Sequence, residues 1–198
     1  MGWGALRVIN DDVVKPGEGF GTHGHRDMEI ISYVLEGTLE HKDSMGNTRQ
    51  IKAGEIQRMA AGTGVRHSEY NPSASEDVHF LQIWIEPNES GVAPEYEYGS
   101  IPISANHGRL KLIASPDSRA GSMRIHQDAF VYCSVLEPGM EAALTLNPIR
   151  KAWVHVATGE CTVSGIPGRA GDGFAITGER ILFIRGVKIC ELIVFDLP

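Results

Sequence analysis

One glycine- and histidine-rich stretch organises this chain: Gly17-Glu18-Gly19-Phe20-Gly21-Thr22-His23-Gly24-His25-Arg26-Asp27-Met28-Glu29. A second polar stretch with a histidine follows downstream: Gly64-Val65-Arg66-His67-Ser68-Glu69-Tyr70-Asn71. Alternate side chains of an extended strand share one face, so we expect His23 and His25 to point the same way, and likewise His67 and Glu69. On neighbouring strands the two pairs would bring three imidazoles and one carboxylate together. Because that donor set suits a divalent transition metal with open positions for a small ligand, we expect a mononuclear metal site.

The segments around these stretches predict an all-β chain. Segments rich in β-branched and aromatic residues alternate with glycine-containing turns, and no long amphipathic helix is indicated. The expected strands are residues 5–9, 29–35, 38–42, 49–52, 56–60 and 78–85, with turns at 10–12, 43–47 and 62–64. Closely spaced strands of this kind predict a sandwich or barrel, and 198 residues suffice for one large β domain or two small ones.

The second half of the chain repeats the first in outline. Residues 33–40 (YVLEGTLE) match 155–162 (HVATGECT) in pattern, and 52–55 (KAGE) match 169–172 (RAGD). We therefore expect two related barrels: 1–96 with the metal site, a proline-containing linker over 97–109, and 110–198. The ligand pairs do not repeat, since the region before Trp153 holds Glu141-Ala142-Ala143 and no His-x-His. We expect the second barrel to bind no metal.

Charge and cysteine content limit the function classes. The formal charge is -7, so no nucleic acid or anionic membrane is indicated as a partner. No apolar run approaches the roughly 20 residues that span a bilayer, the N-terminus lacks the features of a signal peptide, and we expect a cytoplasmic protein. Cys133, Cys161 and Cys190 lie in apolar segments without C-x-x-C spacing. They are expected to be buried reduced thiols.

Taken together, the motifs resemble known families. Gly17, His23-x-His25 and Gly37, followed by Gly54 and Gly64-x-x-His67-x-x-x-Asn71, resemble the two cupin motifs. More closely, residues 5–12, 23–29, 33–37, 43–47 and 66–72 resemble the pirin family, nearest to bacterial members described as quercetin 2,3-dioxygenases. The resemblance implies two tandem cupin barrels, each a double-stranded β-helix or jelly roll, that together form a bicupin.

The resemblance also implies a ligand set and an activity. The ligands would be His23, His25, His67 and Glu69, which hold one divalent transition metal ion per chain. Iron(II) is the first choice, and nickel, manganese, copper or zinc are accepted alternatives. The activity would be cleavage of flavonols such as quercetin with dioxygen, in which two ring bonds break and carbon monoxide leaves. Glu69 would accept or hydrogen-bond the proton of the 3-hydroxyl group of this small aromatic substrate.

Two departures from the family patterns lead to further expectations. Glu29 is one residue too early for the carboxylate ligand of the general cupin motif, so we expect it to support the ligands or the fold. Pirins carry an extra N-terminal segment that precedes the first residue here. We therefore expect a short or truncated form whose first barrel has an edge open to another subunit or protein partner.

Several other residues lack a specific pattern that would assign them a role. We expect surface or core roles for His41, His79, His107, His126 and His155. Gln82 and Trp84 are expected to line the first barrel, with core packing the main role of Trp84. Residues 19–24 fit G-x-G-x-x-G, but no strand-to-helix context follows, so tight turns are expected to explain the glycines. Arg26 and Arg66 either orient an anion or face solvent.

The sequence leaves alternatives to the enzyme. Pirins are also described as redox-responsive regulators that bind a transcription factor through a metal-dependent surface, and a cupin isomerase acting on another small substrate is a third class. A regulator needs the metal and a partner surface, whereas an enzyme also needs an apolar pocket beside open coordination positions.

Overall fold

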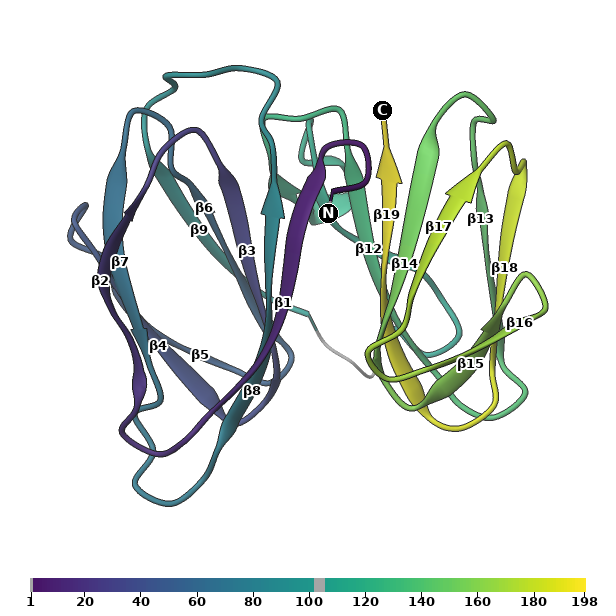
Figure 1. Ribbon diagram of the computed structural model, residues 1–198, viewed down its shortest axis with the longest axis horizontal. Helices are drawn as coiled ribbons and strands as arrows, with labels where there is room; N and C mark the ends of the chain where they lie inside the picture. Colours follow the sequence, from purple (N-terminus) through teal and green to yellow (C-terminus); the bar gives the residue numbers. More distant parts are fainter. Residues whose placement is uncertain (1, 102–105) are drawn as a thin grey trace. The chain divides into compact units, whose positions relative to one another are not determined.

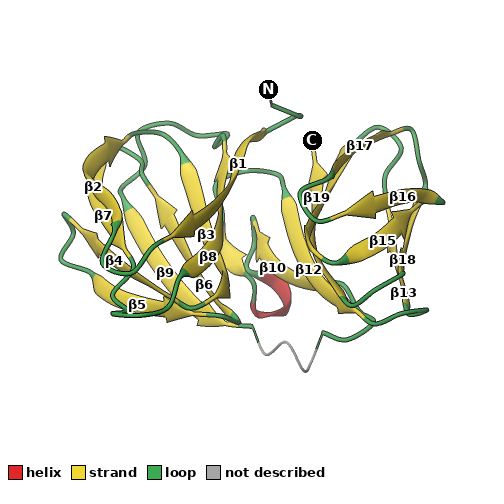
Figure 2. Cartoon of the chain, turned by 60° about the horizontal axis from the view of Figure 1, so that its bottom comes forward, coloured by secondary structure: helices red, strands yellow, loops and turns green. Residues whose placement is uncertain are grey.

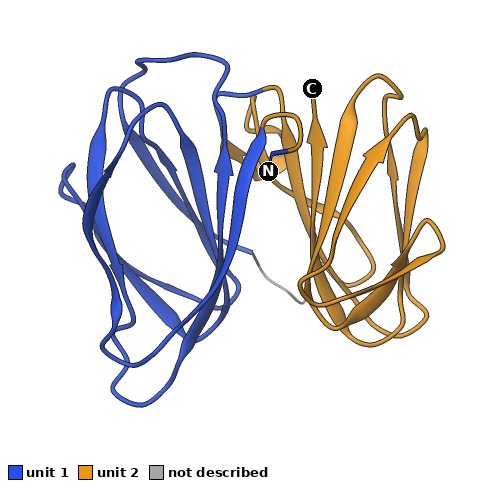
Figure 3. Cartoon of the chain, in the orientation of Figure 1, with its two compact units in different colours: residues 1–2, 6–101, 125–127 blue, residues 3–5, 102–124, 128–198 orange. Residues whose placement is uncertain are grey.

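The computed structural model describes residues 2–101 and 106–198, and strands dominate it (Figure 1; Figure 2). Within these residues there is no α-helix, only a 3-10 turn at Arg119–Gly121. No helix in the described part of the chain is long and apolar enough to cross a membrane. The strands form two compact units (Figure 3). Unit 1 holds Leu6–Ile101 and Ile125–Gln127, and unit 2 holds Trp3–Ala5, the described part of Pro102–Arg124, and Asp128–Pro198.

Unit 1 consists of two antiparallel sheets. The five-stranded sheet has the order β1 (Leu6–Val14), β8 (Val78–Ile85), β3 (Glu29–Glu36), β6 (Glu55–Ala60) and β9 (Glu95–Ser100). The four-stranded sheet has the order β2 (Gly19–His25), β7 (Val65–Tyr70), β4 (Thr38–Asp43) and β5 (Thr48–Lys52). Val34 and Phe80 of the first sheet pack in one buried cluster with Leu39 and Ile51 of the second. Burial of each such side chain stabilises the fold by about 1.5–3 kcal/mol, and their contact closes the sandwich.

Unit 2 repeats this two-sheet plan. Its six-stranded sheet has the order β11 (Met123–Arg124), β10 (Lys111–Ser115), β12 (Phe130–Leu136), β19 (Cys190–Leu197), β14 (Lys151–Thr158) and β17 (Gly173–Thr177). Its four-stranded sheet has the order β13 (Glu141–Thr145), β18 (Ile181–Gly186), β15 (Glu160–Val163) and β16 (Ile166–Arg169). Leu192 and Val194 of the large sheet share a core cluster with Leu182 and Ile184 of the small one. The prediction of an all-β chain with two cupin domains is confirmed.

Two equivalent glycines show the duplication in atomic detail. Gly37 joins β3 to β4 with φ 76°, and Gly159 joins β14 to β15 with φ 75°. A Cβ atom would lie 2.4 Å from the carbonyl oxygen of Asp77 at the first position and 1.9 Å from that of Ile189 at the second. Only glycine fits both the positive φ and this close approach of another chain segment.

The second repeated motif closes a turn in the same way in both units. The Lys52 amide donates to a side-chain oxygen of Glu55 (2.8 Å), and the Arg169 amide donates to Asp172 Oδ2 (2.9 Å). The acidic residue at the end of K/R-A-G-E/D therefore binds back to the amide three residues earlier in each unit. The repeat seen in the sequence is present in the structure.

Two local expectations are corrected. The polar residues 10–12 form no turn, since β1 continues through them and pairs with β8. They fit there because β1 is an edge strand whose polar side chains reach solvent. The glycines between 19 and 24 lie within strand β2 and not in turns. Gly19 is needed because a Cβ atom would lie 2.2 Å from the Glu69 carbonyl oxygen of β7.

The expected linker also differs in part from the structure. Residues 97–100 belong to β9, which pairs with β6 in unit 1, and residues 102–105 lie outside the described residues. The expected domain boundary at residue 96 therefore falls within a strand. Near the N-terminus, Trp3 belongs to unit 2, where its indole Nε1 donates to the Ala152 carbonyl (2.9 Å).

The three cysteines lie in unit 2. Cys133, Cys161 and Cys190 are all described by the structure, all buried, and none forms a disulfide. The sequence interpretation of buried reduced thiols is confirmed.

Candidate metal centre

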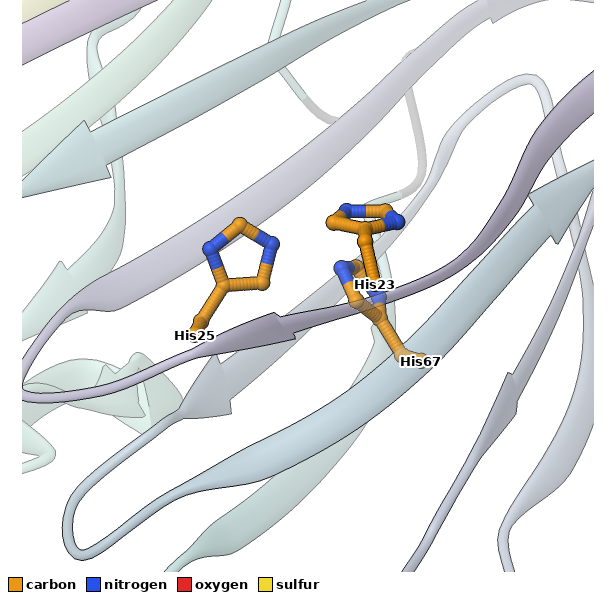
Figure 4. Close-up of side chains that lie close together, drawn as sticks. All are labelled: His23, His25 and His67. Carbon is orange, nitrogen blue, oxygen red and sulfur yellow. The ribbon is translucent and has the colours of Figure 1, made fainter.

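Strands β2 and β7 bring three imidazole rings together. The two strands are antiparallel neighbours, and the register pairs His23 with His67 and His25 with Val65. The ring centroids lie 4.8 Å apart for His23 and His25, 4.5 Å for His23 and His67, and 4.9 Å for His25 and His67. Figure 4 shows His23 and His25 on one strand and His67 on its neighbour, with the rings gathered on one side. Each ring offers a nitrogen within 4.8 Å of the other two.

The Nε2 atoms of His25 and His67 have no protein partner among the described residues, and that of His23 has a lone pair to offer. His23 Nδ1 lies 2.8 Å from the Gly21 carbonyl oxygen and therefore carries the proton, which leaves Nε2 as an acceptor. His25 Nε2 and His67 Nε2 are buried and have no hydrogen-bond partner among the described residues. Buried polar atoms without partners are rare in proteins. A cation between the three rings would satisfy them, so the residues fit a metal ion.

His25 and His67 are held in their neutral forms. Burial lowers the pKa of His67 to about 3, with the nearby His23 and His25 as further causes. Burial likewise lowers the pKa of His25 to about 4, helped by His23. Neutral imidazole is the form that binds metals. At neutral pH neither ring needs to lose a proton before an ion binds.

Glu69, on β7, is a buried carboxylate with three side-chain donors. Ser32 Oγ donates to its Oε1 (3.0 Å), as does Gln57 Nε2 (3.4 Å), and Gln82 Nε2 donates to Oε2. Trp84 Nε1 donates to Gln82 Oε1 (3.1 Å), which turns the amide nitrogen of Gln82 toward the carboxylate. The three donors to Glu69 come from β3, β6 and β8 and set its orientation.

The structure groups Glu69 differently from the sequence interpretation. Its carboxylate clusters with His41 and His67, while His23, His25 and His67 form their own group. Burial raises the pKa of Glu69 to about 7, against the hydrogen bonds from Ser32 and Gln82. Its roles as fourth ligand and proton acceptor stay predictions.

Sequence reasoning missed His41. This histidine lies on β4 directly opposite Glu69 of β7, and it is fully buried. Its Nε2 lies 3.1 Å from Asp43 Oδ2, and its Nδ1 lies 3.5 Å from His67 Nδ1. The only local signal was the His41-x-Asp43 spacing on one strand face. The alignment of β4 with β7 is a long-range feature that this spacing does not reveal.

The remaining candidates lie outside the two histidine groups. Glu29 is buried and pairs with Arg58 (3.8 Å) and His126 (2.8 Å), which agrees with a supporting role. Arg26 and Arg66 are exposed, which favours the solvent-facing interpretation for both.

An apolar cluster borders the histidines. Ile30, Met59, Ala61 and Val65 are buried in it, and Met28, Trp84 and Tyr96 pack against it while partly exposed. The Trp84 ring stands edge-on to His25 at 5.0 Å, so Trp84 also borders the candidate site. The cluster offers an apolar wall beside polar donors, as small-molecule sites do.

Sequence comparison places this chain among known proteins. The family model described as Pirin matches residues 1–85, and the model described as quercetinase C-terminal cupin domain matches residues 112–197. A curated quercetin 2,3-dioxygenase of Escherichia coli K12 is 48% identical over 198 residues, which cover 100% of this chain and 84% of the relative. The chain belongs to the pirin family. A putative quercetin 2,3-dioxygenase of Pasteurella multocida is 44% identical, with 97% of this pirin and 82% of the relative covered.

Solved structures agree with the fold described above. The crystal structure of the bacterial pirin YhhW from E. coli in complex with nickel(II) matches with a TM-score of 0.94 and 48% identity, covering 100% of this chain and 84% of that one. The crystal structure of YhaK from E. coli matches with a TM-score of 0.87 and 27% identity, covering 100% of this chain and 87% of that one. The nickel complex shows that a pirin with this fold takes up a divalent metal.

Proposed function

We propose that this pirin is a metal-dependent dioxygenase that cleaves flavonols such as quercetin. One observation carries the proposal: three imidazole rings converge in a partly buried cluster, and the Nε2 atoms of His25 and His67 have no partner among the described residues. The 48% identity with a curated quercetin 2,3-dioxygenase supports the substrate class. The partners of the protein would then be a flavonol and dioxygen.

The proposed cofactor is one divalent transition metal ion held by His23, His25 and His67, with Glu69 as fourth ligand. Iron(II) is the first ion to test, and nickel(II) stands beside it because of the E. coli pirin complex. Imidazole and carboxylate donors accept several first-row metals, so supply decides between them. When bound, such an ion supplies Lewis-acid and redox chemistry toward an enolic oxygen and dioxygen.

The residues of the chain would bind and orient the substrate. Met28, Trp84 and Tyr96 offer apolar and aromatic surface beside the histidines for the flavonol rings. Glu69 would accept the proton of the 3-hydroxyl group, with Ser32 and Gln82 holding the carboxylate in place. In the overall reaction two bonds of the central ring break, both atoms of dioxygen enter the products, and carbon monoxide leaves with a depside as coproduct.

The test is oxygen uptake with quercetin by protein reconstituted with iron(II) or nickel(II), with metal content measured in the same samples. The double variant His23→Ala, His25→Ala should lose both the bound metal and the uptake. His79→Ala is the matched control, because His79 also lies in unit 1 but pairs with Asp11 outside the cluster. It should keep both.

One result would contradict the proposal: no uptake by protein that holds one metal ion per chain. It would favour the regulatory class or a cupin enzyme with another small substrate.

We also propose a cytoplasmic location, supported by three buried cysteines that form no disulfide.

A further inference from the structure

His67 differs from His23 in the group that contacts its Nδ1 atom. The Nδ1 atom of His23 has a backbone carbonyl as its partner, whereas His67 Nδ1 faces another imidazole, His41 Nδ1, at 3.5 Å. Both rings are buried. A hydrogen bond between two such nitrogens requires a proton on one and a lone pair on the other. The assignment of that proton decides whether His67 Nε2 is free to bind a metal.

The surroundings of His41 assign the proton. His41 Nε2 lies 3.1 Å from Asp43 Oδ2, and a carboxylate only accepts, so Nε2 carries the proton of the neutral ring. His41 Nδ1 is then an acceptor. Gln57 agrees independently, because its Nε2 also lies 3.5 Å from His41 Nδ1. That nitrogen is identified as a donor since it faces Glu69 Oε1, while Gln57 Oε1 accepts from the Tyr96 hydroxyl.

We propose that Asp43 and His41 are positioning residues that fix the tautomer of His67. Asp43 accepts from His41 Nε2–H, His41 Nδ1 accepts from His67 Nδ1–H, and His67 Nε2 is left bare toward His23 and His25. The inference rests on the proposed metal site, and it names the residues that prepare one of its ligands. Outer partners of this kind are known to tune ligand orientation and basicity at metal sites.

Asp43 is held in place for this role. Its Oδ1 accepts from the amides of Met45 (2.9 Å) and Asn47 (3.0 Å), and Asn47 Nδ2 donates to its Oδ2 (2.7 Å). The polar hairpin loop 43–47 thus anchors the carboxylate that His41 needs. The Tyr96 ring stacks on His41 at 5.0 Å and 19°, which holds the plane of the imidazole. Loop and ring together leave His41 little freedom to turn.

The decisive variant is Asp43→Asn, which is nearly isosteric. Its amide oxygen can still accept from Met45 and Asn47, and Asn47 can turn its own amide to match. The new amide nitrogen, however, donates toward His41 Nε2, so the His41 proton moves to Nδ1. His67 Nδ1 must then accept, and its proton moves to Nε2, where it blocks the metal.

The first readout is the tautomer in metal-free protein, measured by long-range proton–nitrogen NMR of ¹⁵N-histidine samples. In the unaltered protein we expect the Nδ1–H form of His67 and the Nε2–H form of His41, and we expect both reversed in Asp43→Asn. The second readout is nickel(II) affinity by calorimetry without substrate, expected to fall about 10–100-fold. Met45→Ala alters a partly exposed side chain of the same loop and should change neither readout.

His41→Phe provides a second variant, because it keeps a ring beside Tyr96 but removes the acceptor. It should also lower the affinity for nickel(II). If the unaltered protein binds nickel while Asp43→Asn keeps the same tautomers and affinity, the inference is wrong and the metal site stands. If the unaltered protein binds two ions and His41→Phe loses one, His41 is a ligand with Glu69 and the positioning role is overturned. If the unaltered protein binds neither nickel nor iron, the proposed metal site itself fails.

Discussion

Gln82 donates a side-chain hydrogen bond to Glu69 Oε2 in the interior of unit 1, and Trp84 Nε1 fixes the direction of that amide from the other side (3.1 Å). All three partners are at least half-buried, and Glu69 is fully buried. A buried carboxylate needs each of its hydrogen-bond donors, because the loss of one donor leaves the cost of removing the carboxylate from water uncompensated.

Gln82→Met should therefore destabilise metal-free unit 1 by about 1–3 kcal/mol. The measurement is urea unfolding of the metal-free protein. Gln50→Met is the matched control, since Gln50 lies on β5 and its side-chain hydrogen bond to Glu40 is exposed to solvent. Equal stability of the two variants would show that the amide of Gln82 does not support Glu69.

Metal binding should stabilise the folded protein. An ion that binds only the folded state at 100 times its Kd adds about 2.7 kcal/mol. We expect nickel(II) to raise the melting temperature, EDTA to reverse the shift, and His67→Ala to abolish it. His79→Ala, altered on the exposed side of β8, should retain the full shift. A shift that survives in His67→Ala would place the bound ion elsewhere.

The stability of metal-free protein should depend on pH through Glu29. Burial raises the pKa of this carboxyl, against the attraction of Arg58 and His126, and Glu95 also contacts both of these side chains. A raised pKa in the folded state means that the contribution is fully present below the unfolded value and is lost as pH rises through the folded pKa.

Glu29→Gln removes that titration. The unaltered protein should lose stability from about pH 4.5 upward relative to the variant, and the difference should level off once Glu29 is ionised. The check is a series of denaturation curves from pH 4 to 8. Parallel curves for the two proteins across this range would contradict the expectation.

Substitutions at Gly37 and Gly46 distinguish the stability cost of backbone strain from that of steric crowding. Both have positive φ, 76° and 96°, but a Cβ atom at Gly37 meets the Asp77 carbonyl oxygen at 2.4 Å, whereas at Gly46 nothing lies within 4 Å. Gly46→Ala should cost about 1–2 kcal/mol of stability through φ alone. Gly37→Ala should cost roughly 3 kcal/mol or more, because the adjoining backbone must also move. Thermal unfolding of both variants compares them directly, and similar losses would mean that the β3–β4 turn adapts.

Local sequence patterns were enough to predict much of the fold of this protein. Alternation along a strand was enough to place His23 and His25 on one face, and the repeated Gly37 and Gly159 turns were enough to predict two related units. These features depend on neighbours a few residues apart, so the chain displays them directly. The same alternation placed His67 and Glu69 on one face, and the family resemblance implied that they join the first pair as ligands.

The hydrogen-bond partners of these candidate ligands depend on contacts between strands that are distant in the sequence. His41 meets His67 because β4 aligns with β7, and Ser32 and Gln82 reach Glu69 because β3 and β8 pair in the other sheet. The same long-range pairing drew the polar residues 10–12 into β1 instead of a turn. Sheet register joins residues that are tens of positions apart, and no local spacing specifies it. The sequence alone therefore predicted which residues would bind a metal. The packing of two sheets determined which polar groups hold them, because buried donors and acceptors must find partners wherever the strands place them.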